Sequence, residues 1–258
     1  MDFPSFVMSI HPAPREAAIF WLGQAGFLIK THSGRLTAID PYFSDCVMRL
    51  IPEEGLGFKR LMPPPCEADA IAFDALLISH EHNDHFDVDS IEAMMRNGRT
   101  HVYCPSQVAE QMRIMGLDMS RVEVLTKGSN VDLGDMTLNA VDCDHGALAP
   151  NALGFLMDLG FTQIYYSGDT ALNPDRLAVP LSVRPEVAIL PINGAFGNLN
   201  GHEAAAFGGM LGAKRVIPCH FWTFPLHHGD PMQIIEAMPL KAPGCVLTLL
   251  RQGEHVMV

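Results

Sequence analysis

One short segment of this sequence concentrates side chains that bind metal ions, His80-Glu81-His82-Asn83-Asp84-His85. Imidazole nitrogens and carboxylate oxygens hold divalent cations when several of them converge at about 2.0–2.2 Å. We expect His80 and His82, two positions apart, to point to one side of an extended turn. Asp84 and His85 follow after the chain bends. The H-x-H-x-D-H pattern therefore predicts partial ligand sets for two neighbouring metal ions.

The elements around this segment explain how it is positioned. Residues 73–79 form a short apolar run that is typical of a buried strand. Residues 86–95 begin with acidic side chains, which predicts a helix that starts just after the segment. The histidines then lie at the end of a strand, where layered α/β folds place their chemistry.

Three further predicted strands each end at one residue that can bind a metal. They cover residues 136–143, 163–167 and 215–219, and they are followed by His145, Asp169 and His220. A carboxylate such as Asp169 can bridge two cations through its two oxygens, which a neutral imidazole cannot do.

The motifs H-E-H-N-D-H, D-H, S-G-D-T and P-C-H, in this order, resemble the metallo-β-lactamase superfamily. The resemblance implies an α/β fold, the four-layer αββα sandwich of that superfamily, with the site at one edge between its two sheets. It also implies a ligand set in which Asp169 bridges two metals. One metal would be held by His80, His82 and His145, and the other by Asp84, His85 and His220.

A closer likeness is to the L-ascorbate-6-phosphate lactonase family. It rests on residues 21–27, 39–41, 79–88, 166–170, 216–220 and 229–231, and it thins between Phe43 and Ala72. That family is manganese-dependent and opens a lactone ring, so the likeness implies a lactonase.

The chemistry expected from such a centre is hydrolysis. Two cations about 3.5–4 Å apart share a hydroxide, because bound water loses a proton near pH 7. Asp84 and Asp169 would orient this nucleophile and move protons. A His/Asp donor set suits zinc or manganese, and iron also fits. Hydrolysis of a small anionic lactone or ester is the first interpretation. A metal-dependent phosphodiesterase and a non-catalytic metal-binding domain are the alternatives.

Two groups of residues outside the motifs are candidates for substrate contact. Arg49, Lys59 and Arg60 gather before the metal segment and would receive an anionic group, or else form a solvated face. The histidines His202, His227 and His228 are the second group. His202 opens a predicted helix at residues 203–207 after a Gly- and Asn-rich loop. His227 and His228 follow His220, and a solvated loop is the alternative for them.

Length and composition indicate one compact enzyme domain over residues 1–258, with 48% hydrophobic residues. The 17 Lys and Arg residues against 29 Asp and Glu argue against nucleic-acid binding. We expect a small-molecule substrate, and the sequence leaves homo-oligomer formation open. No apolar run reaches membrane-spanning length, so no membrane association is expected. The six cysteines form no C-x-x-C pair, and no secretory signal opens the sequence. Both observations predict a cytoplasmic protein with free thiols.

Overall fold

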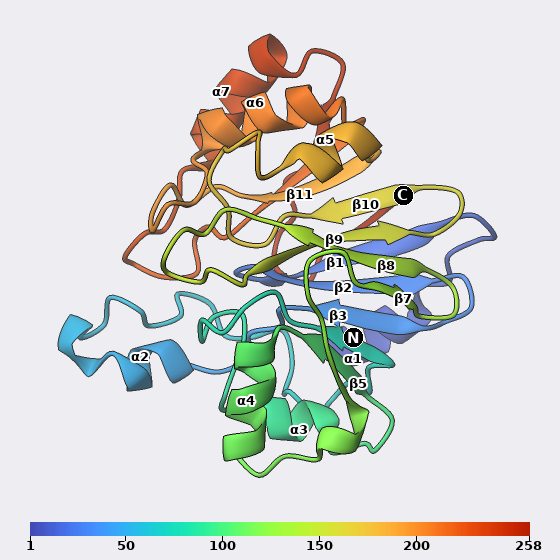
Figure 1. The fold of residues 1–258 in the computed structure, drawn as a ribbon, viewed down its shortest axis with the longest axis vertical. Coiled ribbons are helices and arrows are strands. Elements are labelled where there is room, and N and C mark those ends of the chain that lie inside the picture. Colours follow the sequence, from blue (N-terminus) through green and yellow to red (C-terminus); the bar gives the residue numbers. More distant parts are fainter. The chain divides into compact units, whose positions relative to one another are not determined.

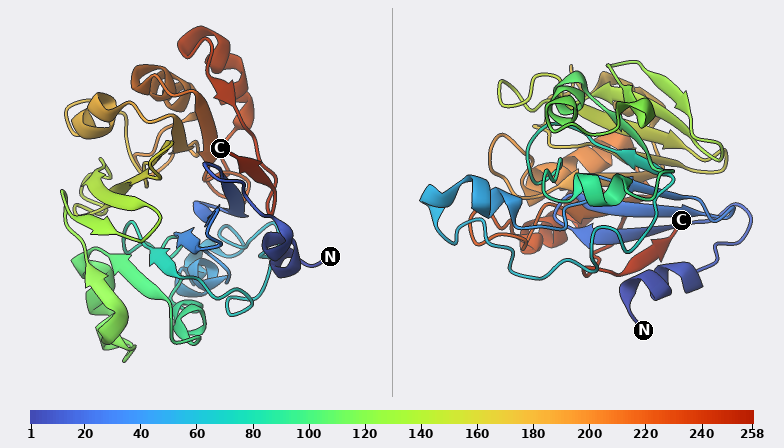
Figure 2. Two further views of the ribbon diagram at one scale, coloured as in Figure 1. Left: turned by 90° about the vertical axis from the view of Figure 1, so that its right-hand side faces the viewer. Right: turned by 90° about the horizontal axis from the view of Figure 1, so that it is seen from below.

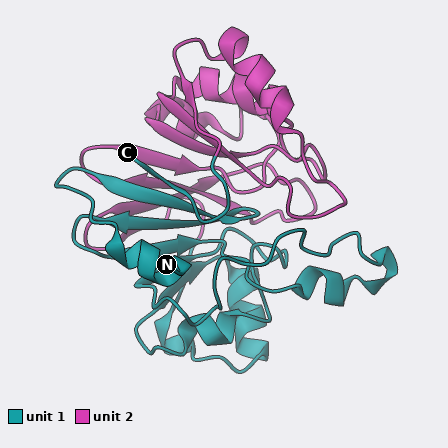
Figure 3. Cartoon of the chain, turned by 180° about the vertical axis from the view of Figure 1, so that it is seen from behind, with its two compact units in different colours: residues 1–125, 250–258 teal, residues 126–249 magenta.

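The computed structural model describes residues 1–258 as two compact units, shown in Figure 3. Unit 1 comprises Met1–Leu125 and Leu250–Val258, and unit 2 comprises Thr126–Leu249. Each unit contains one seven-stranded sheet and its own helices. The prediction of a mixed α/β fold with two sheets is confirmed, whereas a single domain over residues 1–258 stays a prediction.

The sheet of unit 1 has the order β14-β1-β2-β3-β4-β5-β6 (Figure 1). Its neighbours are antiparallel from β14 to β3 and parallel from β3 to β6. Strands β1 to β4 are buried along their whole length, because their sequences are almost continuously apolar. The strands are β1 Ala17–Gly23, β2 Gly26–Thr31, β3 Leu36–Ile39, β4 Ala75–Leu77, β5 His101–Cys104, β6 Val122–Val124 and β14 His255–Met257.

The helices of unit 1 share one apolar cluster with this sheet. Val7 of α1, Met94 of α3 and Met112 of α4 belong to the same buried cluster as Phe20 and Leu76 of the strands. The helices are α1 Phe3–Ser9, α2 Cys46–Leu50, α3 Ile91–Met95 and α4 Ser106–Ile114, with short 3₁₀ turns η1 Pro52–Glu54 and η2 Met119–Arg121.

The sheet of unit 2 has the order β13-β12-β11-β10-β9-β8-β7. It is antiparallel from β7 to β10 and parallel from β10 to β13. Helices α5 and α6 pack against its strands, and α7 packs against α6 on the same side (Figures 1 and 2). The elements are β7 Asn130–Asp132, β8 Thr137–Asp142, β9 Leu153–Asp158, β10 Gln163–Tyr166, α5 Ala178–Val183, β11 Val187–Pro191, α6 Gly201–Leu211, β12 Arg215–Cys219, α7 Pro231–Lys241 and β13 Val246–Leu247.

The helix predicted over residues 86–95 is wrong in its first half. Residues 86 and 87 are not helical, residues 88–90 form a turn, and α3 begins only at Ile91. The reason lies in Asp87, which is 1% exposed and whose carboxylate accepts hydrogen bonds from the backbone amides of Phe43 and Ser44. This acidic residue anchors a distant loop instead of opening a helix. No helix in the structure combines the length and apolar character needed to cross a bilayer.

Candidate metal centre

The first part of the candidate site lies at the end of β4 in unit 1. The amide of Ile78 donates to the carbonyl of Tyr103, so the strand stays paired until the chain reaches His80. His80 is fully buried, and its Nε2 lies 3.0 Å from Nδ1 of His82. The structure therefore brings these two imidazoles to one point, as the H-x-H spacing predicts.

A buried aspartate fixes the ring of His85. Nδ1 of His85 donates to Oδ2 of Asp40 at 2.7 Å, and both side chains are fully buried. Nε2 of His85 then lies 3.8 Å from Oδ2 of Asp84. A histidine that donates from one nitrogen to a carboxylate presents the lone pair of the other, which is the arrangement typical of metal-binding histidines.

A serine extends this arrangement to His80. The Ser79 hydroxyl donates to Asp40, and the Ser79 backbone amide also donates to Asp40 at 2.7 Å. Because the hydroxyl proton is used in this way, its oxygen accepts from Nδ1 of His80, 2.9 Å away. Nε2 of His80 consequently carries the lone pair. Asp40 thus orients two of the predicted metal ligands, one directly and one through Ser79.

Two residues that support the candidate ligands, Asp40 and Gln24, were not predicted from the sequence as functional positions. Asp40 directly follows the buried strand β3, so the strand-end argument used for Asp169 would have found it. Gln24 gave no comparable signal. Its amide donates to Oδ2 of Asp84 at 2.8 Å, from a buried turn with a φ of 50°.

The second part of the candidate site lies in unit 2, where three ligand candidates meet at one carboxylate oxygen. Oδ2 of Asp169 lies 3.8 Å from Nε2 of His145 and 3.4 Å from Nε2 of His220. All three side chains are buried. The parallel strands β10 and β12 bring Asp169 and His220 to the same sheet edge, on either side of β11.

The loop that carries His145 is tied to the end of β10. The amide of Asp144 donates to the Thr170 hydroxyl at 2.9 Å, and the amide of Ala171 donates to the Asp144 carbonyl at 2.8 Å. Hydrogen bonds from Asn173 and then from Arg176 hold the pKa of Asp144 below its usual range. Burial raises the pKa of Asp142, but hydrogen bonds from Arg176 and Lys127 outweigh it and lower that pKa as well. The charge of Arg176 therefore rigidifies the loop.

The donors in both units fit a divalent metal. Each group combines neutral imidazole nitrogens with carboxylate oxygens, and none contains a thiolate. Cys143 stands near His145 in the sequence, but burial raises the pKa of its thiol far above the ordinary value. The structure thus brings together His80 with His82, Asp84 with His85, and Asp169 with His145 and His220.

The six residues predicted to contact substrate differ in burial and in their partners. Arg49 is paired with Asp89 and Lys59 with Asp45. Arg60 is buried and donates to the carbonyls of Tyr42 and Met62, while its Nη2 has no hydrogen-bond partner. The histidines His202, His227 and His228 are exposed. Substrate contact by these six residues stays a prediction.

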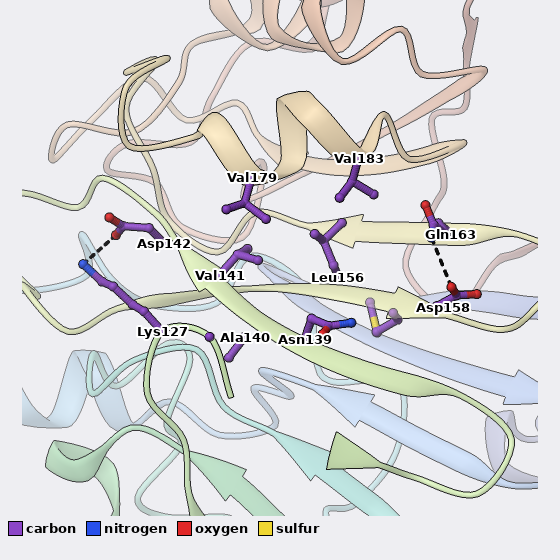
Figure 4. A pocket seen from close by; sticks show the side chains of 12 residues that line it. Lys127, Asn139, Ala140, Val141, Asp142, Leu156, Asp158, Gln163, Val179 and Val183 are labelled. Carbon is purple, nitrogen blue, oxygen red and sulfur yellow. Dashed lines mark hydrogen bonds and ion pairs between the residues drawn. The ribbon is translucent and has the colours of Figure 1, made fainter. Parts of the chain in front are cut away.

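A hollow of about 360 Å³ in unit 2 contains none of the predicted metal ligands. It lies between α5 and strands β8 and β9, with Leu156, Val179 and Val183 on its walls and the Lys127–Asp142 ion pair at one end (Figure 4).

Comparison with known proteins places the chain in a family. Residues 18–220 match the model of the Beta-lactamase superfamily domain. A UPF0173 metal-dependent hydrolase of Hyperthermus butylicus is 30% identical over 91% of this chain and 96% of its own length. Two solved structures share the fold. A metallo hydrolase of Ignicoccus hospitalis has a TM-score of 0.74 at 19% identity, covering 94% of this chain and 98% of its own. The isothiocyanate hydrolase from Delia radicum gut bacteria has a TM-score of 0.73 at 18% identity, covering 93% and 98%.

Proposed function

We propose that this chain, which belongs to the metallo-β-lactamase superfamily as one of its metal-dependent hydrolases, opens small anionic lactones or related esters with two divalent metal ions. The proposed ligands are His80, His82, His145, Asp84, His85 and His220, with Asp169 shared between the ions. Manganese and zinc both suit these nitrogen and oxygen donors, and so does iron.

The observation that carries the proposal is the fixed protonation of the buried histidines. Asp40 accepts from Nδ1 of His85, and Ser79 accepts from Nδ1 of His80. Both rings are therefore held with the lone pair on Nε2. In this tautomer Nε2 can only accept, so it suits a cation or a hydrogen-bond donor. A lone pair held next to a carboxylate, as on His85 beside Asp84, suits a cation.

The residues of the chain have separable tasks in hydrolysis. When bound, the ions supply Lewis-acid polarisation and a water of lowered pKa. Asp84 is held in place by the Gln24 amide, so its carboxylate is positioned to accept a proton from the attacking water. Asp169 of unit 2 would hold metal together with His145 and His220, whose Nε2 atoms lie 3.8 and 3.4 Å from its Oδ2. The chain needs no serine or cysteine nucleophile for this reaction.

The lactone, as opposed to another ester, is the finer part of the proposal. It is supported by the likeness to the L-ascorbate-6-phosphate lactonase family in residues 79–88, 166–170 and 216–220. The charged group of such a substrate suits Arg60 better than Arg49 or Lys59, because only Arg60 lacks a carboxylate within ion-pair distance. A buried guanidinium without an anionic partner is costly, and a bound anion would offset that cost.

The proposal is tested with the full chain, loaded with manganese or zinc and freed of excess metal. Metal analysis is expected to approach two ions per chain. δ-Valerolactone, L-ascorbate-6-phosphate and bis(p-nitrophenyl) phosphate serve as substrates. Turnover of a lactone supports the proposal, and turnover of the phosphodiester alone would replace it with the phosphodiesterase alternative. A metal-loaded protein that turns over neither class would favour a non-catalytic metal-binding domain.

The role of the charged group is tested by Arg60→Gln with Lys59→Ala as the matched control. We expect Arg60→Gln to raise KM for the phosphorylated lactone and to leave the neutral lactone unchanged, since a charge clamp binds ground and transition states alike. An equal loss on both substrates would show that Arg60 only holds the loop through Tyr42 and Met62.

A further inference from the structure

The loop between β11 and α6, residues 192–200, runs between the two ligand-bearing strand ends of unit 2. The amide of Ile192 donates to the carbonyl of Cys219 at 3.0 Å, next to His220. The amide of Leu199 donates to the carbonyl of Thr170 at 2.9 Å, next to Asp169. The bridge between Asn193 and Asn200 closes the loop on itself. The 192–200 loop is thus fixed by its backbone beside two predicted metal ligands.

Two side chains of the 192–200 loop are buried without hydrogen bonds. Asn193 is 9% exposed and Asn198 is 5% exposed. In both carboxamides the nitrogen and the oxygen are buried and have no hydrogen-bond partner. Buried amides are nearly always bonded, because leaving such a group unsatisfied costs stability. Two of them in one short loop therefore need an explanation.

Two other asparagines of unit 2 have side chains that form hydrogen bonds. The side chain of Asn200 accepts from the amide of Glu203 and caps α6. The side chain of Asn173 donates to Asp144 at 2.7 Å. Asn193 and Asn198 differ from these two residues, because their side-chain amides are buried and have no hydrogen-bond partner. Unsatisfied polar groups of this kind persist where function requires them.

The backbone at Gly229 lies close to Asn193 and to Ile192. A Cβ at Gly229 would lie 3.3 Å from Cα of Asn193, 3.2 Å from the carbonyl of Ile192 and 3.0 Å from Cβ of Phe221. Gly229 has a φ of +66°, so this position suits glycine in conformation as well as in space. The segment after His220 therefore packs against the 192–200 loop and helps to enclose it.

We propose that Asn193 and Asn198 are substrate-binding residues whose carboxamides hydrogen-bond the uncharged oxygen atoms of the substrate. This inference rests on the proposed function and names the group recognised next to Asp169 and His220. A carboxamide both donates and accepts, so the pair suits an acyl carbonyl together with a hydroxyl or ring oxygen. The recognised class is a lactone or ester that carries further hydroxyl groups. A donor aimed at the acyl oxygen also stabilises the charge that develops on it during attack.

The experiment replaces each amide with an apolar side chain of similar size, as Asn193→Leu and Asn198→Leu. Removing an unsatisfied polar group leaves stability unchanged or improves it. We therefore expect the Tm of each variant, with metal content unchanged, to equal or exceed that of the wild type. The matched control Asn200→Leu loses a helix cap, and its Tm is expected to fall by about 2–4 °C.

The second readout is turnover of δ-valerolactone and of D-glucono-δ-lactone, which carries hydroxyl groups. One of the two amides should donate to the acyl oxygen. The variant that lacks this amide is expected to lose about 10²–10³-fold in kcat/KM on both lactones. The other variant is expected to lose more on the hydroxylated lactone than on δ-valerolactone. An unchanged kcat/KM in both variants would overturn the inference while the proposed function stands.

The stability readout decides the inference without any substrate. If Asn193→Leu and Asn198→Leu lower the Tm as much as Asn200→Leu, the amides are satisfied within the protein, for example by bound water, and the inference is wrong. A wild type that hydrolyses no lactone would refute the proposed function instead.

Discussion

At the scale of single residues, the contact between Asp40 and His85 decides which nitrogen of the His85 ring carries the proton. A carboxylate accepts only, so Nδ1 of His85 must carry the proton. The same carboxylate sets the tautomer of His80 through the hydroxyl of Ser79. A buried residue that touches no substrate therefore controls the basicity and the orientation of two predicted ligands.

Asp40→Asn is expected to weaken metal binding about 10–100-fold. The asparagine oxygen can still accept from the amide of Ser79, but its NH₂ group then faces Nδ1 of His85. Two donors cannot share a hydrogen bond, so His85 is driven to the tautomer with its proton on Nε2. Competition with a chromophoric chelator measures the change.

The control for this variant is Asp87→Asn, which alters another buried carboxylate of unit 1 that holds backbone amides and no histidine. It is expected to lower stability without the specific loss of metal affinity. Equal metal affinity in Asp40→Asn and the wild type would rule out the orienting role of Asp40.

Asp84→Asn is expected to reduce turnover by roughly 10²–10⁴-fold, the contribution typical of a general acid or base. The change should leave folding nearly intact, because Asp84 lies in a partly exposed loop outside the apolar core, and an asparagine oxygen can still accept from the amide of Gln24. Activity, metal content and thermal unfolding are measured on the same preparation. Near wild-type turnover with the metal retained would contradict the proton-transfer role.

The candidate ligands could be proposed from the sequence because each follows a strand of recognisable pattern. The supporting residues could not all be found in this way. Asp40 follows a strand and was within reach, but Gln24 approaches Asp84 across 60 positions of the chain. No local pattern encodes such a pairing, since it depends on how β1 and β2 are arranged beside the metal segment. The lack of hydrogen bonds at the buried side-chain amides of Asn193 and Asn198 likewise follows from the tertiary structure and not from the sequence.

At the scale of elements, the sequence predicts best where one strand alone carries the signal. Residues 215–219 coincide with β12, and residues 163–167 match β10 within one residue. The run at residues 73–79 is longer than β4, because only Ala75–Leu77 pairs on both sides. The helix expected at residues 203–207 extends over Gly201–Leu211, since the capping box of Asn200 and Glu203 starts it earlier.

The packing of α6 against α7 is a tertiary feature that overrides local propensity. Gly209 lies within α6, where an alanine would ordinarily favour the helix by up to about 1 kcal/mol. A Cβ at this position, however, would lie 2.1 Å from the backbone carbonyl oxygen of Lys241, at the end of α7. Backbone cannot yield as a flexible side chain does, so the two helices would have to move apart.

Gly209→Ala is therefore expected to lower the free energy of unfolding by about 1–3 kcal/mol, the usual cost of overpacking. Urea denaturation followed by circular dichroism measures the effect. Met210→Ala, at an exposed neighbouring position of the same helix, serves as the control and should change stability little. A more stable Gly209→Ala protein would mean that helix propensity outweighs the close approach of α7.

At the scale of the whole molecule, the predicted ligands are divided between the two units. His80, His82, Asp84 and His85 belong to unit 1, and His145, Asp169 and His220 belong to unit 2. A division of ligands between two distant segments of the chain leaves no pattern in any short stretch of sequence. Only the order of the motifs along the chain, and its likeness to a known family, predicted that the two groups act together.

Metal binding is expected to stabilise the whole chain, and removing the metal to lower its Tm. A ligand that binds only the folded state adds about 2.7 kcal/mol at a free concentration of 100 Kd. If ligands of both units hold the ions, His82→Ala and His145→Ala each reduce the rise in Tm on adding manganese or zinc to the chelator-treated protein. His202→Ala, which changes an exposed histidine of α6, should keep the full rise. A rise that disappears in His82→Ala and stays complete in both His145→Ala and His220→Ala would confine metal binding to unit 1, and the proposed two-metal centre would have to be abandoned.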